Sequence, residues 1–388
     1  MDPRTNPYSP GAGLRPAALA GRESELEAFE VAMHRARAGR SAQSMILHGL
    51  RGVGKTVLLN ELANVARSKN WIVGAVEADL RGARTPFGRQ LSRALSDGMR
   101  EQTGAGNLGE RMKRALATFK SFSFSVFGTG ASLELQERGA TGTLTADLTD
   151  LVLDLAAAAQ DIDTGIAVFI DEMQHLEQQE LAAISQACHA ANQRNLPFVV
   201  VGAGLSNLPR VLSEAVSYAE RLYDYRSLGR LADDDARAAL ELPAQAEGVE
   251  WDQGAVEVVL AASGGYPYFI QQFGQTSWNE SAGSPIEPAA AHAGVRLGRE
   301  MLDNGFFRAR WDRATPAERE FMSAMAADGE GPSESGEVAR RLGKRLNALG
   351  PARANLIAKG LVWAPEHGQI AFSVPGMAEF IAREVARS

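Results

Sequence analysis

The sequence predicts an α/β fold in which a parallel sheet is followed by a helical region and then by a small domain of helices and a hairpin. Up to residue 228, apolar runs typical of buried strands alternate with segments of helical apolar spacing, as in a parallel sheet. From Ala232 only helical spacing is found, and beyond about Ala314 three helices precede a strand–turn–strand segment, the plan of a winged helix. We expect a flexible N-terminal tail over 1–20, an α/β core over 21–228, a helical lid over 229–310 and a winged-helix domain over 311–388.

The individual elements follow from the period of the apolar residues. Strands are expected over residues 45–47, 71–78, 166–171 and 198–202, and two short strands within 361–374. Helices are expected over residues 21–38, 57–63, 147–160, 180–194, 234–246, 254–263, 269–279, 316–327, 336–342, 347–359 and 377–385. A helix between successive strands is the usual connection in a parallel sheet.

Residues 120–136 alternate strictly between apolar and polar side chains on both sides of a glycine turn. This pattern predicts a β-hairpin, inserted where the α/β core does not need one. We expect either an amphipathic flap over the core or a self-association or DNA-facing element, since insertions often carry function.

Composition is that of an ordinary globular protein, with 45% hydrophobic and 22% charged residues among 388. The formal net charge of −7 argues against a generally basic nucleic-acid-binding surface but is compatible with a local basic face. Cys188 is the only cysteine, so an intrachain disulfide and a cysteine-based metal site are excluded. The sequence has no apolar run of membrane-spanning length and no signal-peptide core, so we expect a cytoplasmic protein without a membrane partner.

The most informative motif is Gly49-Leu50-Arg51-Gly52-Val53-Gly54-Lys55-Thr56, which fits the phosphate-binding pattern G-x-x-x-x-G-K-T. It lies between a predicted strand and a predicted helix, where backbone N–H groups and the helix N-terminus face a polyphosphate. Lys55 is expected to reach the β- and γ-phosphates, and the Thr56 hydroxyl to bind Mg²⁺. The predicted nucleotide contacts in this loop are Gly49, Arg51, Gly52, Val53, Gly54, Lys55, Thr56 and Val57.

A second motif is the apolar strand 166–170 followed by Asp171-Glu172. Asp171 is expected to hold Mg²⁺ against Thr56 through water. Glu172 is the natural general base for a water that attacks the γ-phosphate. Two solvated acids at a strand end would be the simpler reading, but the pairing with the glycine loop favours ATP hydrolysis.

Three further positions are candidates with simpler alternatives. Ser206 or Asn207, after the strand at 198–202, is placed to sense the γ-phosphate, or merely forms a strand-to-helix turn. Arg221 could stabilise transition-state charge in a neighbouring subunit, or could pair on the surface with Glu220 or Asp224. Pro267, in Gly264-Gly265-Tyr266-Pro267-Tyr268, could contact the nucleotide, or could simply break a helix.

Together these residues resemble the motifs of AAA+ ATPases of the origin-recognition type and their STAND relatives. The shared order is Gly21-Arg22-Glu23, the Walker A loop, Asp171-Glu172, Gly202-Ala203-Gly204, Glu220-Arg221-Leu222, Gly265-Tyr266-Pro267 and a winged helix. The resemblance covers most of residues 15–388. It implies a P-loop NTPase core, Arg15 and Pro16 beside the adenine, and a lid that closes over the nucleotide. Where many AAA+ lids carry a sensing arginine, this chain has Tyr266-Pro267, as STAND-like proteins do.

The predicted winged helix carries a local cluster of basic residues. Between Val338 and Lys359 the sequence contains no acid, and the cluster falls on the helices that a winged helix presents to DNA. The expected DNA contacts are Arg340, Arg341, Lys344, Arg345, Asn347, Arg353 and Lys359, with Asn355 near base edges and His367 at the wing tip. The alternative is a protein-interaction module with an ordinary solvated face.

These observations lead to one principal hypothesis of function. The chain is expected to bind ATP and Mg²⁺, to hydrolyse ATP, and to use nucleotide state to control the lid and winged helix or to assemble into a homo-oligomer that acts on double-stranded DNA. The first alternative is a STAND-type signalling switch whose winged helix contacts a partner protein. A further alternative is an accessory ATPase of transposition or phage defence.

Overall fold

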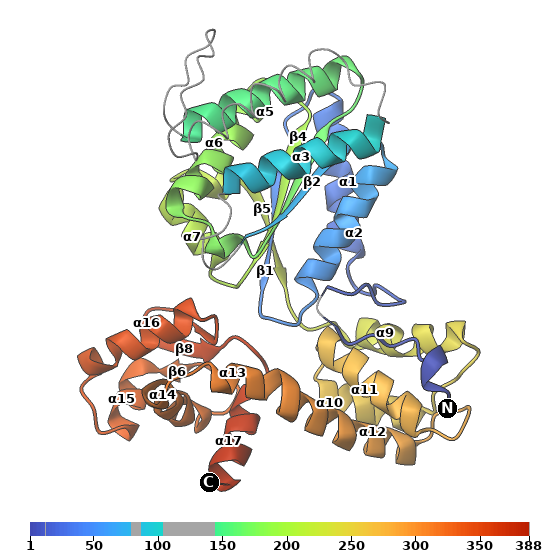
Figure 1. Ribbon diagram of the computed structural model, residues 1–388. Helices are drawn as coiled ribbons and strands as arrows, with labels where there is room; N and C mark the ends of the chain where they lie inside the picture. Colours follow the sequence, from blue (N-terminus) through green and yellow to red (C-terminus); the bar gives the residue numbers. More distant parts are fainter. Residues whose placement is uncertain (12, 79–86, 104–143, 388) are drawn as a thin grey trace. The chain divides into compact units, whose positions relative to one another are not determined.

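The computed structural model describes residues 1–11, 13–78, 87–103 and 144–387 (Figure 1). These residues fold into two compact units. The core unit comprises Arg22–Gly49 and Lys55–Leu228, and the second unit comprises Met1–Gly21, Leu50–Gly54 and Gly229–Ser388. The hairpin expected over residues 120–136 lies outside the described residues.

The core unit is built on a five-stranded sheet with the strand order β2-β3-β4-β1-β5. Every neighbouring pair is parallel, which confirms the predicted α/β class. The strands are β1 (Ser44–Gly49), β2 (Ile72–Glu77), β3 (Ile166–Asp171), β4 (Phe198–Gly204) and β5 (Tyr223–Leu228). Sequence periodicity missed β5 because only its end residues, Tyr223 and Leu228, are buried. All five strands end at one edge of the sheet, the edge at which open α/β sheets bind ligands.

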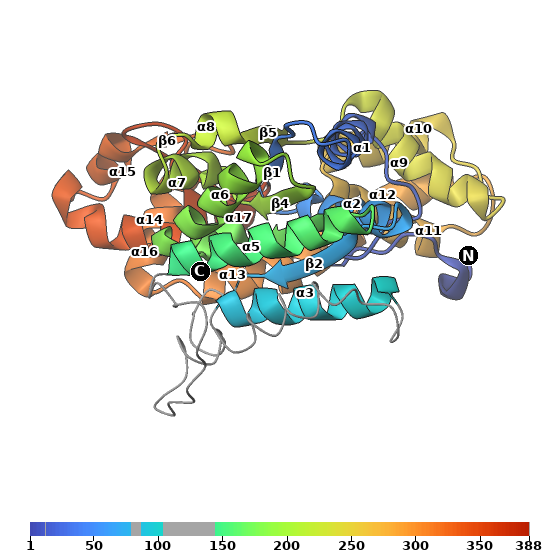
Figure 2. The same cartoon turned by 90° about the horizontal axis from the view of Figure 1, so that it is seen from above.

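Helices cover both faces of this sheet (Figures 1 and 2). Helices α1 and α2 lie on one face and α5, α6 and α7 on the other, as right-handed crossovers require for this strand order. The helices of the core unit are α1 (Glu23–Arg37), α2 (Lys55–Ser68), α3 (Phe87–Thr103), α5 (Leu144–Asp161), α6 (Gln178–Gln193), α7 (Leu208–Ala215) and α8 (Ala219–Leu222). Helix α3 lies directly on β2, since a Cβ at Gly98 would be only 2.0 Å from the Val73 carbonyl oxygen.

The centre of the core unit consists of fully buried strand residues that the sequence placed correctly. Ile46, Val168, Phe169 and Val200 are at most 2% exposed, and each such side chain contributes about 1.5–3 kcal/mol of hydrophobic stabilisation. The ring of Phe29 in α1 meets Phe169 edge-on at 5.8 Å. The core therefore fixes the strand ends that carry the functional residues.

The N-terminal segment is docked, and the expectation of a loose tail over residues 1–20 is wrong. Tyr8 is only 1% exposed, its hydroxyl donates to the Leu240 carbonyl, and the Trp251 indole N–H donates to Tyr8. Gly274 leaves room for this ring, since a Cβ there would be 2.7 Å from Tyr8. Sequence reasoning missed the docking because one aromatic residue in a polar, proline-rich segment has no periodicity.

Four helices of the second unit form a helical layer that the docked N-terminal segment covers. They are α9 (Asp233–Ala246), α10 (Gln253–Ser263), α11 (Pro267–Glu280) and α12 (Pro288–Met301). Gly264 and Gly265 have φ values of 57° and 75°, a left-handed conformation that ends α10 and suits glycine. Pro267 then occupies the first position of α11, where a missing N–H is harmless. Helix α12 had no counterpart in the sequence-based prediction.

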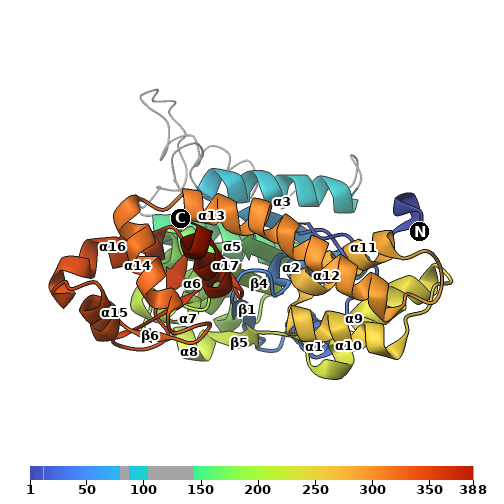
Figure 3. The same ribbon diagram turned by 90° about the horizontal axis from the view of Figure 1, so that it is seen from below.

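The C-terminal part of the second unit has the predicted plan of a winged helix (Figure 3). Its small sheet has the order β6-β8-β7, with antiparallel pairs. Its elements are α14 (Pro316–Ala326), β6 (Ser333–Glu334), α15 (Ser335–Arg341), η4 (Leu346–Leu349), α16 (Gly350–Ala358), β7 (Val362–Trp363), β8 (Gln369–Phe372) and α17 (Met377–Arg387). The π-helix η3 (Leu302–Phe307) and the short α13 (Arg308–Asp312) connect α12 to this part. None of the helices in the described part of the chain combines the length and apolarity needed to cross a membrane.

Candidate nucleotide site

The glycine loop connects β1, which ends at Gly49, to α2, which begins at Lys55. Gly52 and Gly54 have φ values of 84° and 89°, so the loop needs glycine at both positions. The Lys55 ammonium donates to the Gly49 carbonyl oxygen at 3.1 Å, which folds the side chain back over the loop. On β1, burial and then the charge of Lys55 lower the pKa of His48, so its imidazole stays neutral at physiological pH.

Residues 50–54 of the loop make their hydrogen bonds with the second unit. The Arg51 N–H donates to the Ser373 carbonyl of the winged helix at 3.1 Å, and the Tyr268 N–H of α11 donates to the Gly52 carbonyl at 3.3 Å. The Arg310 guanidinium stacks on the Phe306 ring at 3.8 Å. Burial, followed by the charge of Arg51, lowers the pKa of Arg310 to about 10. The loop is thus joined to both the helical layer and the winged helix.

The two predicted metal ligands lie together in the core unit. The Thr56 hydroxyl at the start of α2 donates to Asp171 Oδ2 at the end of β3 over 2.6 Å. Thr56 Oγ1 and the Asp171 carboxylate are the hard oxygen donors that Mg²⁺ prefers, alongside water and phosphate oxygens. The residues present therefore fit the cation that the sequence predicted.

Glu172 has a left-handed backbone, with φ 48° and ψ 35°, a conformation that costs a non-glycine residue of the order of 1 kcal/mol. Its N–H donates to Asp171 Oδ1 at 2.8 Å, which links the two acids. The Gln174 side-chain amide in η2 (Met173–His175) donates to Glu172 Oε2. Strain of this kind is common at functional sites, where surrounding contacts hold it in place.

The predicted sensing position lies at the start of α7. Asn207 precedes Leu208 as the N-cap residue, and Ser206 is half-buried beside it. Among the described residues, the buried Asn207 Oδ1 has no hydrogen-bond partner. A buried unpaired acceptor is costly, so the position suits a polar ligand or a bound water.

Arg221 lies in α8 on the surface of the core unit. Its backbone carbonyl accepts a hydrogen bond from Gln43 at 3.0 Å. Asp224, one of its suggested surface partners, is instead paired with Arg226 at 2.7 Å. Within the part of the chain that the structure describes, the Arg221 guanidinium makes no ion pair.

The predicted adenine contacts belong to the second unit. Arg15 and Pro16 lie in the docked N-terminal segment, and Pro267 opens α11. The turn before Pro267 is fixed by a hydrogen bond from the Leu231 N–H to the Gly265 carbonyl at 2.8 Å. A Cβ at Gly265 would lie 2.8 Å from the Leu231 carbonyl oxygen, so the close approach of the two backbones requires glycine here.

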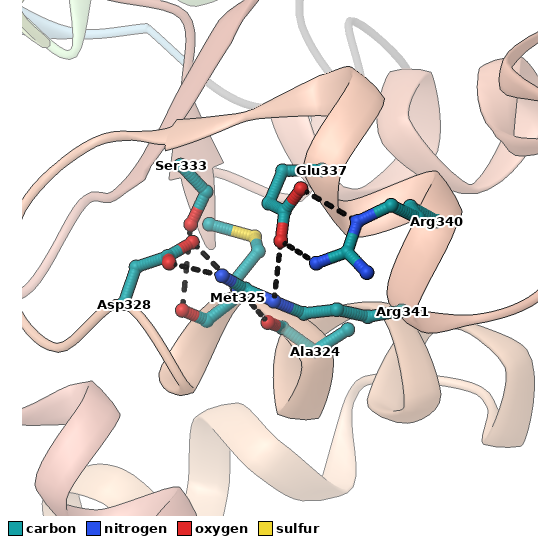
Figure 4. A network of polar contacts seen from close by, with 7 residues as sticks. All are labelled: Ala324, Met325, Asp328, Ser333, Glu337, Arg340 and Arg341. Atoms are coloured by element: carbon teal, nitrogen blue, oxygen red, sulfur yellow. Dashed lines mark hydrogen bonds and ion pairs between the residues drawn. The ribbon is translucent and has the colours of Figure 1, made fainter.

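The basic cluster of the winged helix is largely neutralised by acids, one on the same helix α15 and others from elsewhere in the fold (Figure 4). Arg341 bonds to Asp328 and to the Ala324 carbonyl, and Arg340 bonds to Glu337. Arg341 lowers the pKa of Asp328, and Arg340 lowers the pKa of Glu337. The acid-free span of sequence is therefore no acid-free surface, because Glu337 lies just before it on α15 and folding brings Asp328 to it.

The remaining basic candidates divide into structural and exposed side chains. Lys359 pairs with the buried Glu318, and the Arg353 guanidinium donates to the Gln369 carbonyl at 3.2 Å. Lys344 pairs with Glu320 at 2.9 Å on the surface. Arg345 is exposed, and it makes no ion pair among the described residues. The exposed candidates also include Asn347, Asn355 and His367.

Sequence reasoning missed residues that the structure places at or beside this site. In the core unit, the Gln174 side-chain amide donates to Glu172. In the second unit, the Tyr268 N–H and the Ser373 carbonyl are hydrogen-bonded to Gly52 and Arg51 of the loop, and Arg310 interacts electrostatically with Arg51. Backbone groups give no sequence signal. Gln174 had one available signal, its place two residues after Glu172.

Two sequence families match the chain. Residues 18–201 match a family described as AAA ATPase domain. Residues 304–381, which include the winged helix, match a family described only as a domain of unknown function (DUF8462). A search of curated proteins gives no significant match.

Several solved structures are similar to the chain at low sequence identity. The Walker-type ATPase PABY2304 of Pyrococcus abyssi matches with a TM-score of 0.58 and 14% identity, over 95% of this chain and 97% of that one. The Aeropyrum pernix Orc1 protein, solved in complex with DNA, has a TM-score of 0.46 and 16% identity, over 96% and 95%. The Thermotoga maritima RuvB Holliday junction branch migration motor has a TM-score of 0.46 and 16% identity, over 93% and 96%.

Proposed function

We propose, from the match of residues 18–201 to the AAA ATPase domain family, that the chain is an AAA+ ATPase that binds and hydrolyses Mg·ATP and couples nucleotide state to a winged helix that acts on duplex DNA. The observation that carries the hydrolysis proposal is the 2.6 Å hydrogen bond between Thr56 and Asp171. It brings the hydroxyl of the glycine loop to the carboxylate at the end of β3, the two groups that hold Mg²⁺ in P-loop ATPases.

Each residue has a defined task in this chemistry. Lys55 and the loop N–H groups bind the β- and γ-phosphates, and Mg²⁺, when bound by Thr56 and Asp171, neutralises phosphate charge. Glu172 accepts a proton from the attacking water. Asn207 lies at the end of the strand next to β3 and offers a polar contact to the γ-phosphate or the water. Arg310, buried beside Arg51 of the loop, is a further cation for phosphate charge.

The hydrolysis proposal is tested by measuring nucleotide affinity and phosphate release together. We expect the wild-type protein to bind ATP and to release phosphate only with Mg²⁺. Lys55→Ala should lose nucleotide affinity, whereas Lys69→Ala, a matched surface change next to Glu30, should behave like the wild type. Full nucleotide affinity in Lys55→Ala would contradict the site assignment.

In the second unit, hydrogen bonds connect the glycine loop to the winged helix, and nucleotide could control the winged helix through them. Ser373 of the winged helix and Tyr268 of α11 are hydrogen-bonded to Arg51 and Gly52 of the glycine loop. A nucleotide that rearranges these loop residues would change both contacts. Assembly through Arg221 is the other route, and molar mass in solution with ADP, with ATP and with ATP plus DNA tests it. A monomer under all three conditions would leave Arg221 without a role in a neighbouring subunit.

We propose that the exposed residues of the basic cluster are the ones that contact DNA. Lys359, Arg353 and Arg341 already hold the winged helix together. Lys344 remains accessible to phosphates, because its surface ion pair with Glu320 contributes only about 0–1 kcal/mol. Arg345 and the nearby Asn347 are exposed. The double change of Lys344 and Arg345 to Ala should reduce the salt dependence of duplex binding by about two phosphate contacts.

A matched pair in the second unit controls this test. Arg299 in α12 and Arg308 in α13 lie outside the winged helix, so changing both to Ala should leave the salt slope unchanged. Equal loss in both variants would indicate attraction by overall charge. If neither the wild type nor an ATP-loaded Glu172→Gln variant binds duplex DNA at low salt, the winged helix is instead a protein-interaction module.

A further inference from the structure

The side chain of Gln174 connects the proposed general base to the end of the neighbouring strand. Its amide nitrogen donates to Glu172 Oε2, and its amide oxygen accepts the Leu205 N–H at 3.0 Å. Leu205 directly follows β4 and precedes Ser206 and Asn207, the residues at the predicted sensing position. One side chain thus joins Glu172 to the sensing end of β4.

The surroundings of Gln174 leave its amide little freedom. Its nitrogen also lies 3.3 Å from His175 Nε2, and His175 Nδ1 lies 3.4 Å from the Ala78 carbonyl. An imidazole protonated on Nδ1 satisfies both contacts, since it donates to Ala78 and accepts from Gln174. Gly204 provides the space on the other side, because a Cβ there would lie 2.4 Å from the Gln174 amide oxygen.

These contacts have a chemical consequence for Glu172. The backbone of Glu172 is left-handed, so local backbone preference works against its placement and contacts of the side chain must help to hold it. A donor at the carboxylate favours the charged form, which is the form that accepts a proton. Because the same amide is tied to Leu205, a shift of the β4 end changes the position of Glu172.

We propose that Gln174 is a positioning residue for ATP hydrolysis, which aligns the Glu172 carboxylate and transmits the state of the β4 end to it. This inference rests on the proposed hydrolytic function. It assigns to Gln174 a task separate from nucleotide binding, which belongs to the glycine loop and Thr56.

Gln174→Leu removes both hydrogen bonds while keeping a side chain of similar size. We expect Mg·ATP affinity within about threefold of the wild type and a kcat reduced about tenfold or more, the effect of losing a hydrogen bond to a charged group. A purely structural role would reduce affinity and thermal stability along with kcat.

Two further variants separate the two ends of the link. Gln174→Glu retains an acceptor for Leu205 but places a second carboxylate against Glu172, so it should lower kcat further than Gln174→Leu does. Gly204→Ala displaces the amide oxygen without changing Gln174 itself and should also lower kcat. The matched control is Gln178→Leu, whose amide donates to the Glu214 carbonyl at 2.9 Å on the surface, and it should leave every readout unchanged.

The decisive readout does not depend on turnover. The carboxyl ¹³C chemical shift of Glu172 at pH 7, identified by its absence in Glu172→Gln, should differ between folded Gln174→Leu and the wild type, because the carboxylate has lost a hydrogen-bond donor. An unchanged chemical shift, or an unchanged kcat in both Gln174 variants, would overturn the inference. A wild-type protein that hydrolyses no ATP would refute the proposed function, and the chemical shift would still decide whether Gln174 contacts Glu172.

Discussion

Replacing Lys359 by Met is predicted to destabilise the winged helix, because Lys359 neutralises a buried acid. Its ammonium donates to Glu318 Oε2 and to the Arg313 carbonyl, the latter at 3.0 Å. The Glu318 side chain is only 3% exposed. It also accepts the Thr315 N–H at 2.8 Å in the capping box that begins α14. The change therefore leaves a buried carboxylate without its cation.

The expected loss of unfolding free energy follows from the burial of the Glu318 carboxylate. Removing one partner of a buried ion pair costs about 3–5 kcal/mol. Water reaches part of the pair, because the Lys359 side chain is 29% exposed, so we expect about 2–3 kcal/mol at neutral pH. If the winged helix unfolds as a separate transition, its Tm should fall by roughly 10–20 °C, given about 4–8 °C per kcal/mol for a domain of this size.

The pH dependence of stability shows whether the Lys359–Glu318 pair stabilises the winged helix. Burial acts to raise the pKa of Glu318, but the hydrogen bonds from Lys359 and Thr315 outweigh it and the pKa is lowered. A lowered folded-state pKa contributes stability above the unfolded pKa of Glu318 that is lost as pH falls through the folded value. The stability difference between Lys359→Met and wild type should therefore shrink on acidification, as the carboxylate becomes protonated in both proteins.

Urea unfolding of wild type, Lys359→Met, Glu318→Gln and the double variant, at pH 7 and pH 4, measures these terms. The double variant should be less destabilised than the sum of the single changes, because it leaves no unpaired charge. A loss below about 0.5 kcal/mol for Lys359→Met, or strictly additive effects, would refute the reasoning and return Lys359 to the DNA-contact candidates.

Three further predictions concern the glycine loop and the N-terminal segment. Thr56→Ala should weaken ATP binding about tenfold or more with Mg²⁺ but little in EDTA. Titration calorimetry measures both affinities, and an equal loss under the two conditions would exclude a role of Thr56 in metal binding. Gly54→Ala should cost about 1–2 kcal/mol through its left-handed backbone and should lower nucleotide affinity; an unaffected affinity would contradict the loop geometry. Tyr8→Phe should lower the free energy of unfolding in urea by about 1–3 kcal/mol, because the Leu240 carbonyl and the Trp251 N–H lose a hydrogen-bond partner. Unchanged stability would contradict a docked N-terminal segment.

The sequence predicted the α/β class because its central strands are apolar throughout and its glycine loop has a fixed pattern. Strands β3 and β4 are buried on both faces, so composition alone identified them. Strand β5 and the docked Tyr8 were missed, because their placement depends on partners far away in the sequence. The match of residues 18–201 to the AAA ATPase domain family agrees with the predicted AAA+ resemblance over that part of the chain, and the parallel sheet confirms the predicted α/β class.

The candidate site was predictable where chemistry and local geometry coincide. Thr56 and Asp171 are 115 residues apart in the sequence, yet each lies at the end of an element that the sequence identified. The basic cluster shows the opposite case. The acids that pair with Arg341 and Lys359 come from other elements, Asp328 and Glu318, so a count of charges along the chain overestimated the free positive surface.

The central claim is that Asp171 and Glu172 complete a site for ATP hydrolysis, and phosphate release by Glu172→Gln tests it most directly. The variant should bind Mg·ATP with wild-type affinity, because the glycine loop, Lys55 and Thr56 are untouched. Its rate of phosphate release should fall by about 10²–10⁴-fold, the range typical of a lost general base. Phosphate release at the wild-type rate, with ATP bound normally, would contradict the account.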